Sequence, residues 1–131
     1  KYIRVSTGLD YAFSGRAFGQ IEYHHNGVTL DQIQEEKENL QSAKLPVGVL
    51  LRGKNYLIPN FTYQLGPLWK MGFQGIFNTS DNSSFLSIFT AYNVKENIDA
   101  NLTYYHFQGD REASEYGLNP DIVYLGLSYY F

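Results

Sequence analysis

Apolar and polar residues alternate one by one along seven segments of this chain. The segments cover residues 2–13, 17–26, 55–65, 69–78, 84–94, 98–108 and 122–131. Successive side chains of a β-strand point to opposite faces, so this alternation predicts strands with one apolar face and one polar face. Six of the segments have about 9 to 11 residues, which is the length that a tilted strand needs to cross a lipid bilayer. The pattern therefore predicts an all-β chain.

The composition is rich in aromatic residues without being unusually apolar. The 131 residues include 12 Tyr, 9 Phe and 1 Trp, but hydrophobic residues make up only 44% of the chain. No apolar run approaches the roughly 18 to 20 residues of a membrane-spanning helix. A transmembrane β-barrel needs no such run, because each strand is apolar only on its lipid face. The composition is therefore compatible with that class of protein.

The lengths of the connections separate the two ends of the predicted strands. Tight turns at residues 14–16, 66–68 and 95–97 each contain a turn-forming Gly, Pro or Asn. If the strands alternate in direction, these turns all lie at one end, and the opposite end receives residues 27–54, 79–83 and 110–121. Outer-membrane barrels have short periplasmic turns and longer extracellular loops. The connections therefore fit such a barrel.

The longest connection, residues 28–54, is predicted to be an extracellular loop with a short helix. Thr29 and Gln32 form a Thr-x-x-Gln capping box, which is typical of a helix start. Residues 33–40 would continue the helix for about two to three turns. The apolar stretch at residues 45–51 could instead be a short strand of an eight-stranded barrel, but two connections would then change side.

The last segment, residues 122–131, alternates apolar residues up to the terminal Phe131. In this respect it resembles the closing strand of bacterial outer-membrane β-barrels. The resemblance implies an outer-membrane location, contact with the lipid bilayer and lipopolysaccharide, and recognition of Phe131 by the barrel-assembly machinery. A second resemblance, to the C-terminal region of large porin-like proteins of environmental bacteria, rests on short stretches at residues 8–13, 21–27, 56–57, 78–83 and 114–117. Some proteins of that group act as sleeves for multihaem cytochromes.

The number of predicted strands is odd, whereas bacterial single-chain barrels have an even number with both termini in the periplasm. If Phe131 ends a strand that descends to the periplasm, the strand at residues 2–13 also descends and needs an ascending strand before it. We therefore expect an antiparallel transmembrane β-barrel of which residues 1–131 are a single domain or the C-terminal portion. The remaining strands of the larger, even-stranded barrel would come from the same chain or another chain.

The polar face of the predicted strands would line the lumen, and it carries the candidate functional residues. These residues share hydrogen-bonding or ionisable groups that would point inward. They are Arg4, Asp10, Gln20, Glu22, His24, Asn60, Gln64, Lys70, Gln74, Asp99 and Asn101. Rows of opposite charge across a pore create a transverse field that selects small polar or charged solutes. For any one of these residues, the alternative is that a water-filled lumen simply tolerates polar groups.

Aromatic residues gather at the strand ends that adjoin the tight turns. Amphipathic rings anchor membrane proteins at the interface between lipid and water. The predicted anchors are Tyr11, Phe13, Tyr63, Trp69, Tyr92, Tyr129 and Phe131. Pro59, in the third segment, has no N–H to donate to a neighbouring strand, so an edge strand or a bulge is expected there.

The sequence lacks the motifs of catalysis and cofactor binding. It has no Cys, no nucleophile motif, no Gly-rich phosphate loop and no haem-attachment motif, so we expect neither an enzyme nor a cofactor. His24 and His25 are adjacent, and adjacent strand residues face opposite sides, so no metal site is expected there. A net charge of −3 argues against a nucleic-acid partner.

Together these features predict an outer-membrane porin or channel that passes small polar solutes through a water-filled lumen. The main alternative is a structural sleeve that holds a partner, such as an electron-transfer or surface protein. A third possibility is a soluble, lipocalin-like binding barrel, which would place its apolar face inside.

Overall fold

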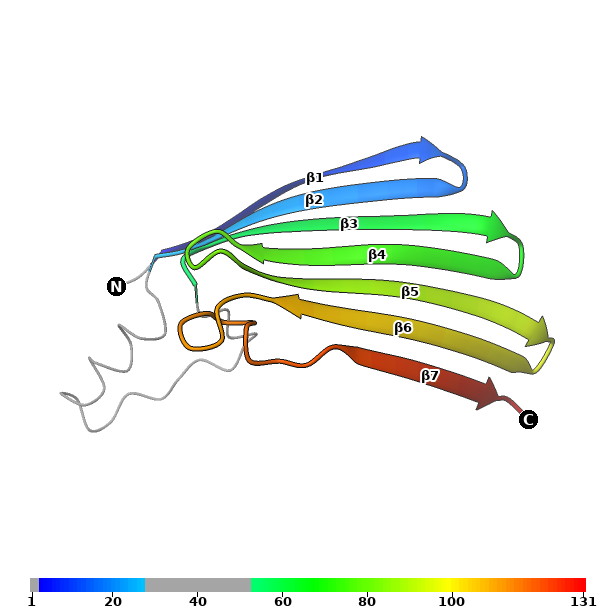
Figure 1. Ribbon diagram of the computed structural model, residues 1–131. Coiled ribbons are helices and arrows are strands. Elements are labelled where there is room, and N and C mark those ends of the chain that lie inside the picture. Colours follow the sequence, from blue (N-terminus) through cyan, green and yellow to red (C-terminus); the bar gives the residue numbers. More distant parts are fainter. Residues whose placement is uncertain (1–2, 28–52) are drawn as a thin grey trace, which may run out of the picture.

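The structure is a computed structural model that describes residues 3–27 and 53–131. These residues form one antiparallel sheet whose strands follow each other in sequence order (Figure 1). The strands are β1 (Arg4–Ser14), β2 (Ala17–Asn26), β3 (Asn55–Gly66), β4 (Trp69–Asn78), β5 (Ser83–Lys95), β6 (Ile98–Gln108) and β7 (Ile122–Tyr129). The described residues include no helix that is long and apolar enough to cross a membrane.

The seven strands correspond to the seven predicted segments, which confirms the prediction of an antiparallel, all-β chain. The main differences are at the two outer strands, where β1 begins at Arg4 and β7 ends at Tyr129. The predicted helix at residues 29–40 and the alternative strand at residues 45–51 lie outside the described residues. The same holds for residues 28–52 of the predicted long loop.

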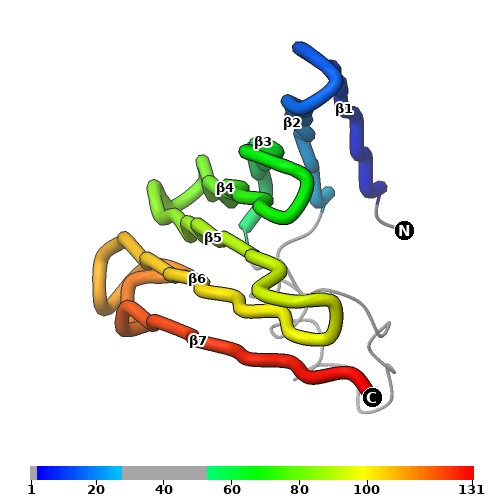
Figure 2. Tube along the Cα trace, turned by 90° about the vertical axis from the view of Figure 1, so that its right-hand side faces the viewer, coloured from blue at the N-terminus to red at the C-terminus, as the bar shows by residue number. Residues whose placement is uncertain are grey.

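The sheet is curved, but it is not closed. Figure 2, which looks at the sheet from the right-hand side of Figure 1, shows an arc that runs from β1 to β7 and opens on one side. β1 and β7 are the two edges, and each pairs with only one neighbour. Both edge strands run in the same direction, toward the right-hand end of the sheet in Figure 1.

The connections differ between the two ends of the sheet. Residues 15–16, 67–68 and 96–97 join β1 to β2, β3 to β4 and β5 to β6, and all of these turns lie at the right-hand end of Figure 1, which is termed the turn end. The connections of residues 79–82 and 109–121 lie at the opposite end, which is termed the loop end, and β2 ends and β3 begins at this end too. The predicted grouping of the tight turns at one end is therefore confirmed.

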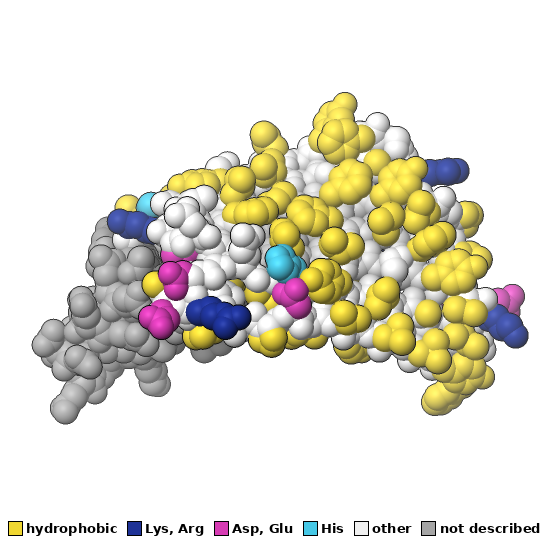
Figure 3. Space-filling model, viewed as in Figure 1, with side chains coloured by type: hydrophobic (Ala, Val, Ile, Leu, Met, Phe, Trp, Pro, Cys, Tyr) yellow, Lys and Arg dark blue, Asp and Glu magenta, His cyan; other side chains and the backbone are white. Residues whose placement is uncertain are grey.

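Strand register sorts the side chains onto two faces, because residues that pair directly across a sheet share a face. One such row contains Tyr63, Met71, Thr90, Leu102 and Leu125, which follow each other from β3 to β7. This row belongs to the convex face, which Figure 3 shows covered by hydrophobic side chains, with most charged side chains toward the two strand ends. The alternate residues, many of them polar, belong to the concave face.

The sheet leaves most of its apolar surface uncovered. Within the described residues, Tyr56 is the only buried hydrophobic side chain. By contrast, Leu9, Leu125 and Leu127 each expose 75–76% of their surface. A soluble domain packs the apolar face of a sheet against a second layer. The described part of this chain has a single layer.

Pro59 lies in the middle of the sheet, so the expectation of an edge strand or a bulge is wrong. Pro59 pairs with Ile21 of β2, and β4 lies on its other side. Pro59 has no paired residue on β4, although the register between β3 and β4 is the same on both sides of it. The N–H that proline lacks is therefore at a position where the two strands are not paired. A Cβ atom on Gly75 of β4 would lie 3.2 Å from Pro59 Cγ. The absent side chain of Gly75 therefore makes room for the proline ring.

Candidate functional site

The polar residues predicted for a lumen share the concave face of the sheet. The register places there Arg4, Asp10, Gln20, Glu22, His24, Asn60, Gln64, Lys70, Gln74, Asp99 and Asn101. Asp10, Gln20, Asn60 and Gln74 pair directly in one row across β1 to β4. Strands are about 4.8 Å apart, so this row is a continuous polar band around part of the arc.

A cavity of about 320 Å³ lies among concave-face residues at the turn end and is termed the turn-end cavity. Its lining includes the polar concave-face side chains Gln64, Lys70, Asn93, Asp99, Asn101 and Ser128, together with Trp69, Tyr92 and Tyr130. Gln64, Lys70, Ala91 and Asn101 form one directly paired row from β3 to β6. The fold therefore gathers predicted lumen residues that are far apart in the sequence around one cavity.

The turn-end cavity contains one positive and one negative side chain. The Lys70 ammonium group makes no hydrogen bond or ion pair with the described residues, and its nitrogen lies more than 4.0 Å from the Asp99 carboxylate. Asp99 accepts a hydrogen bond from the side-chain amide of Asn93, over 2.6 Å. Since an amide carries no charge, the negative charge of Asp99 is not neutralised. Two opposite charges thus line the same cavity without pairing with each other.

Small side chains keep the space around these charges open. Ala91 lies between Lys70 and Asn101 in their common row and contributes only a methyl group. Gly126 pairs with Asn101 on the other side, and a Cβ atom there would lie 2.1 Å from Asn101 Oδ1. This oxygen is buried and has no hydrogen-bond partner among the described residues. A larger residue in place of Gly126 would displace the Asn101 amide.

At the loop end, residues 109–121 fold over the concave face through Glu115. Glu115 Oε2 accepts hydrogen bonds from the Tyr56 hydroxyl and, over 2.9 Å, from the Asn78 amide. The Glu115 N–H donates to the Asp81 carboxylate over 2.8 Å. Tyr56 and Asn78 belong to β3 and β4, so these bonds attach the connection between β6 and β7 to the middle of the sheet.

Tyr116 continues this attachment with an aromatic contact. Its ring lies 6.4 Å from that of Phe85, measured between centroids. Burial, followed by the negative charges of Glu115 and Asp81, raises the pKa of Tyr116 above its ordinary value. The phenol is therefore neutral over the physiological range. The inward fold of residues 109–121 was not predicted, because strand alternation carries no information about where a loop packs.

His24 and His25 each contact a neighbouring asparagine side chain. His24 and His25 lie on opposite faces, as their adjacency predicts. His24 Nε2 lies 2.9 Å from Asn26 Oδ1, and His25 Nδ1 lies 2.7 Å from Asn55 Oδ1. In residues 3–27 and 53–131, no group of three or more His, Asp and Glu side chains is placed to hold a metal ion.

Asp121 forms a polar cluster at the loop end of the convex face. It accepts a hydrogen bond from the Tyr104 hydroxyl over 2.7 Å, and its carboxylate lies 3.0 Å from His106 Nδ1. The bond from Tyr104, and then the contact with His106, lower the pKa of Asp121 below its ordinary value. The cluster joins the end of β6 to the start of β7.

The predicted aromatic anchors all lie at or near the turn end. Trp69 begins β4, Phe13, Tyr63 and Tyr92 lie near the ends of their strands, and Tyr129 ends β7. The Trp69 indole N–H donates to Thr90 Oγ1 over 2.7 Å, and its ring meets Tyr92 edge-on at 6.1 Å between centroids.

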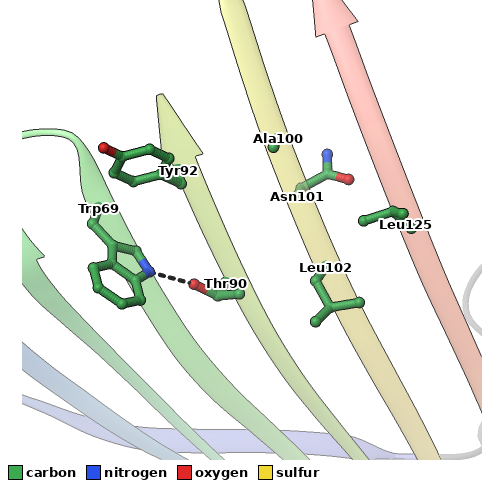
Figure 4. A pocket seen from close by; sticks show the side chains of 7 residues that line it. All are labelled: Trp69, Thr90, Tyr92, Ala100, Asn101, Leu102 and Leu125. Carbon is green, nitrogen blue, oxygen red and sulfur yellow. Dashed lines mark hydrogen bonds between the residues drawn. The ribbon is translucent and has the colours of Figure 1, made fainter. Parts of the chain in front are cut away.

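An apolar groove of about 440 Å³ lies beside Trp69 and Tyr92. Figure 4 shows these rings and the Trp69–Thr90 hydrogen bond on β4 and β5, with Leu102 and Leu125 facing the groove from β6 and β7. The register puts all of these side chains on the convex face. The turn end thus has an aromatic, apolar convex side and a polar concave side.

Comparison of the chain with protein-family models, with curated proteins and with solved structures found no match. Its function must therefore be inferred from the chemistry and the placement of its own residues.

Proposed function

We propose that this chain forms part of the wall of a transmembrane β-barrel in a bacterial outer membrane, and that the barrel passes small polar solutes through a water-filled lumen. The observation that carries this proposal is the division of one curved sheet into an apolar convex face and a largely polar concave face (Figures 2 and 3). In barrels of this kind, lipid contacts the apolar outer face, while water and solutes contact the inner face.

The distribution of charge supports a lipid-facing convex side. Arg4, Asp10, Glu22, Lys70 and Asp99 all lie on the concave face. The remaining charged strand residue, Lys95, is the last residue of β5 and follows a shift in register next to a turn. A cationic side chain on the lipid face costs about 2–4 kcal/mol at the bilayer midplane and much less near the interfaces. The charges thus avoid the surface where they would be costly.

The exposed apolar surface also favours a membrane over water. A soluble, lipocalin-like barrel would turn its apolar side chains inward, whereas Leu9, Leu125 and Leu127 lie on the convex face and are largely exposed. Keeping such a surface in water costs roughly 25 cal/mol for each Å² of apolar area. Lipid removes this cost, so the soluble alternative explains the arrangement less well.

The aromatic turn end supports the proposed orientation. Trp69, Tyr92 and Tyr129 are rings with a polar group, which is the type of side chain that anchors at a membrane interface. In this proposal the turn end faces the periplasm and the loop end faces the exterior.

Closure of the proposed barrel requires further strands. Because β1 and β7 run in the same direction, an antiparallel barrel needs an odd number of additional strands between them. We propose that the same polypeptide or another chain supplies these strands. The backbone groups along both edges would then be paired, as a membrane interior demands.

Planar-bilayer conductance of the complete assembly tests the proposal. After purification in detergent, insertion should produce discrete current steps in salt solution. Recovery of the protein as a monodisperse monomer in buffer without detergent would contradict the membrane location. Stable insertion without current would contradict the channel.

A sleeve that holds a partner protein is the second candidate, and one feature favours it. The concave face is not uniformly polar, because Phe18, Phe89 and Tyr124 lie there beside the paired rows of polar residues. Phe18 and Tyr124 expose 41% and 56% of their surfaces. A partner inside the barrel would cover these rings. Such an assembly would copurify with the partner at a fixed ratio and would conduct little until the partner is removed.

A further inference from the structure

We propose that the turn-end cavity binds small zwitterionic solutes of the amino-acid class. The inference rests on the proposed function, because it assumes that the concave face lines a solute pathway. The ammonium group of the solute would approach the Asp99 carboxylate, and its carboxylate would approach the Lys70 ammonium group. Both protein charges line the cavity, and neither is neutralised by a described residue.

The spacing of the two charges suits a ligand that lies between them. Lys70 is on β4 and Asp99 is on β6, so β5 separates their strands by roughly 9.5 Å. Asp99 also lies two residues, or roughly 7 Å, farther along β6 than Asn101, which shares the row of Lys70. The Lys70 nitrogen and the Asp99 carboxylate are too far apart to form an ion pair. On β5, Ala91 pairs with Lys70 and contributes only a methyl group, while Asn93 pairs with Asp99. A solute with charges at its two ends can bridge this gap.

The same pair of charges disfavours solutes that carry a single charge. An anion attracted by Lys70 also meets the negative charge of Asp99, and a cation attracted by Asp99 meets Lys70. Only a zwitterion gains from both groups at once. The side chains of Gln64 and Ser128 add neutral hydrogen-bonding groups to the same wall.

Isothermal titration calorimetry on the complete assembly in detergent tests this inference. The probe is γ-aminobutyrate, which has a charge at each end. Butyrate and butylamine are its matched analogues, because each lacks one of the two charges. We expect γ-aminobutyrate to bind at least tenfold more tightly than either analogue. The variants Lys70→Met and Asp99→Asn should each weaken its binding at least tenfold.

Two substitutions elsewhere serve as controls for lost charge. Glu112→Gln removes an exposed carboxylate from the connection between β6 and β7 at the loop end, and Lys95→Met removes a lysine next to a turn. Both should leave the affinity within twofold of the unmodified protein. The zwitterion site would be overturned if γ-aminobutyrate and butyrate bound with equal affinity. It would also be overturned if Asp99→Asn bound γ-aminobutyrate as tightly as the unmodified protein. Conductance of the same preparation is measured separately. Current without binding of γ-aminobutyrate would overturn this inference alone, whereas the absence of current would overturn the proposed function.

Discussion

The Tyr56 hydroxyl in β3 donates a hydrogen bond to Glu115, although the two residues are 59 positions apart in the sequence. Tyr56 is fully buried, and its oxygen also accepts a hydrogen bond from the Gly53 N–H. A carboxylate accepts a stronger hydrogen bond than a neutral oxygen does. This bond therefore holds residues 109–121 against the concave face and shapes the loop end of the proposed lumen.

Replacing Tyr56 with Phe should loosen residues 109–121. The variant retains the ring but removes the hydroxyl that donates to the Glu115 carboxylate, whereas the hydrogen bond from the Asn78 amide is kept. A hydrogen bond to a charged group contributes about 1.5–3 kcal/mol, which corresponds to roughly 10- to 160-fold faster amide exchange in the loop. Hydrogen–deuterium exchange with mass spectrometry measures this change.

Tyr23→Phe is the matched control for this experiment. The Tyr23 hydroxyl donates over 2.8 Å to the neutral Asn55 side chain at an exposed position. Its loss should change the exchange of residues 109–121 by less than twofold. Equal effects of the two substitutions would show that Glu115 does not anchor the loop.

Replacing Gly72 with Ala should destabilise the sheet. A Cβ atom at this position would lie 2.4 Å from the ring of Phe89 and 2.9 Å from the backbone oxygen of Phe61. The ring and the backbone would both have to move, and overpacking of this kind costs about 1–3 kcal/mol. Gly66→Ala is the control, because nothing lies within 4 Å of its added Cβ atom. Urea unfolding in lipid vesicles compares the two variants, and similar losses would contradict the close contact with Phe89.

Local patterns were sufficient to predict the strands, because the two faces of a strand depend only on neighbouring residues. Long-range placement could not be predicted in the same way. Pro59 is accommodated in a central strand by Gly75, and this relationship requires the register of β3 against β4. The contact between Tyr56 and Glu115 likewise depends on how a loop folds back.

The candidate site was predicted in composition but not in arrangement. Alternation was enough to place Lys70 and Asp99 on one face, since both follow the polar period of their strands. Their shared cavity depends on the small side chain of Ala91 and on the register of β4, β5 and β6. The sequence does not show which residues of neighbouring strands pair, so the cavity could not be foreseen.

The pKa of Asp121 should rise when Tyr104 is replaced with Phe. Its value is lowered mainly by the hydrogen bond from Tyr104, so the contacts of the ionised carboxylate stabilise the fold above the ordinary carboxyl pKa of 3.8. This stabilisation is lost as the pH falls through the lowered pKa of the folded state. Titration of the Asp121 side-chain carbon by NMR measures the shift. A larger rise for His106→Ala than for Tyr104→Phe would contradict the dominant role of the tyrosine bond.

Arginine at two adjacent positions of β4 should distinguish a lipid-facing convex surface from a water-exposed one. Phe73 pairs with Phe61 and Ile88 on the convex face, while Gln74 pairs with Asn60 and belongs to the concave face. In a bilayer, Phe73→Arg should cost about 2–4 kcal/mol, because the charge would lie near the middle of the apolar band. Gln74→Arg should cost less than about 1 kcal/mol, since the lumen is hydrated. Urea unfolding in vesicles measures both free energies. If Phe73→Arg were as well tolerated as Gln74→Arg, the convex face would lie in water and the proposed barrel would have to be abandoned.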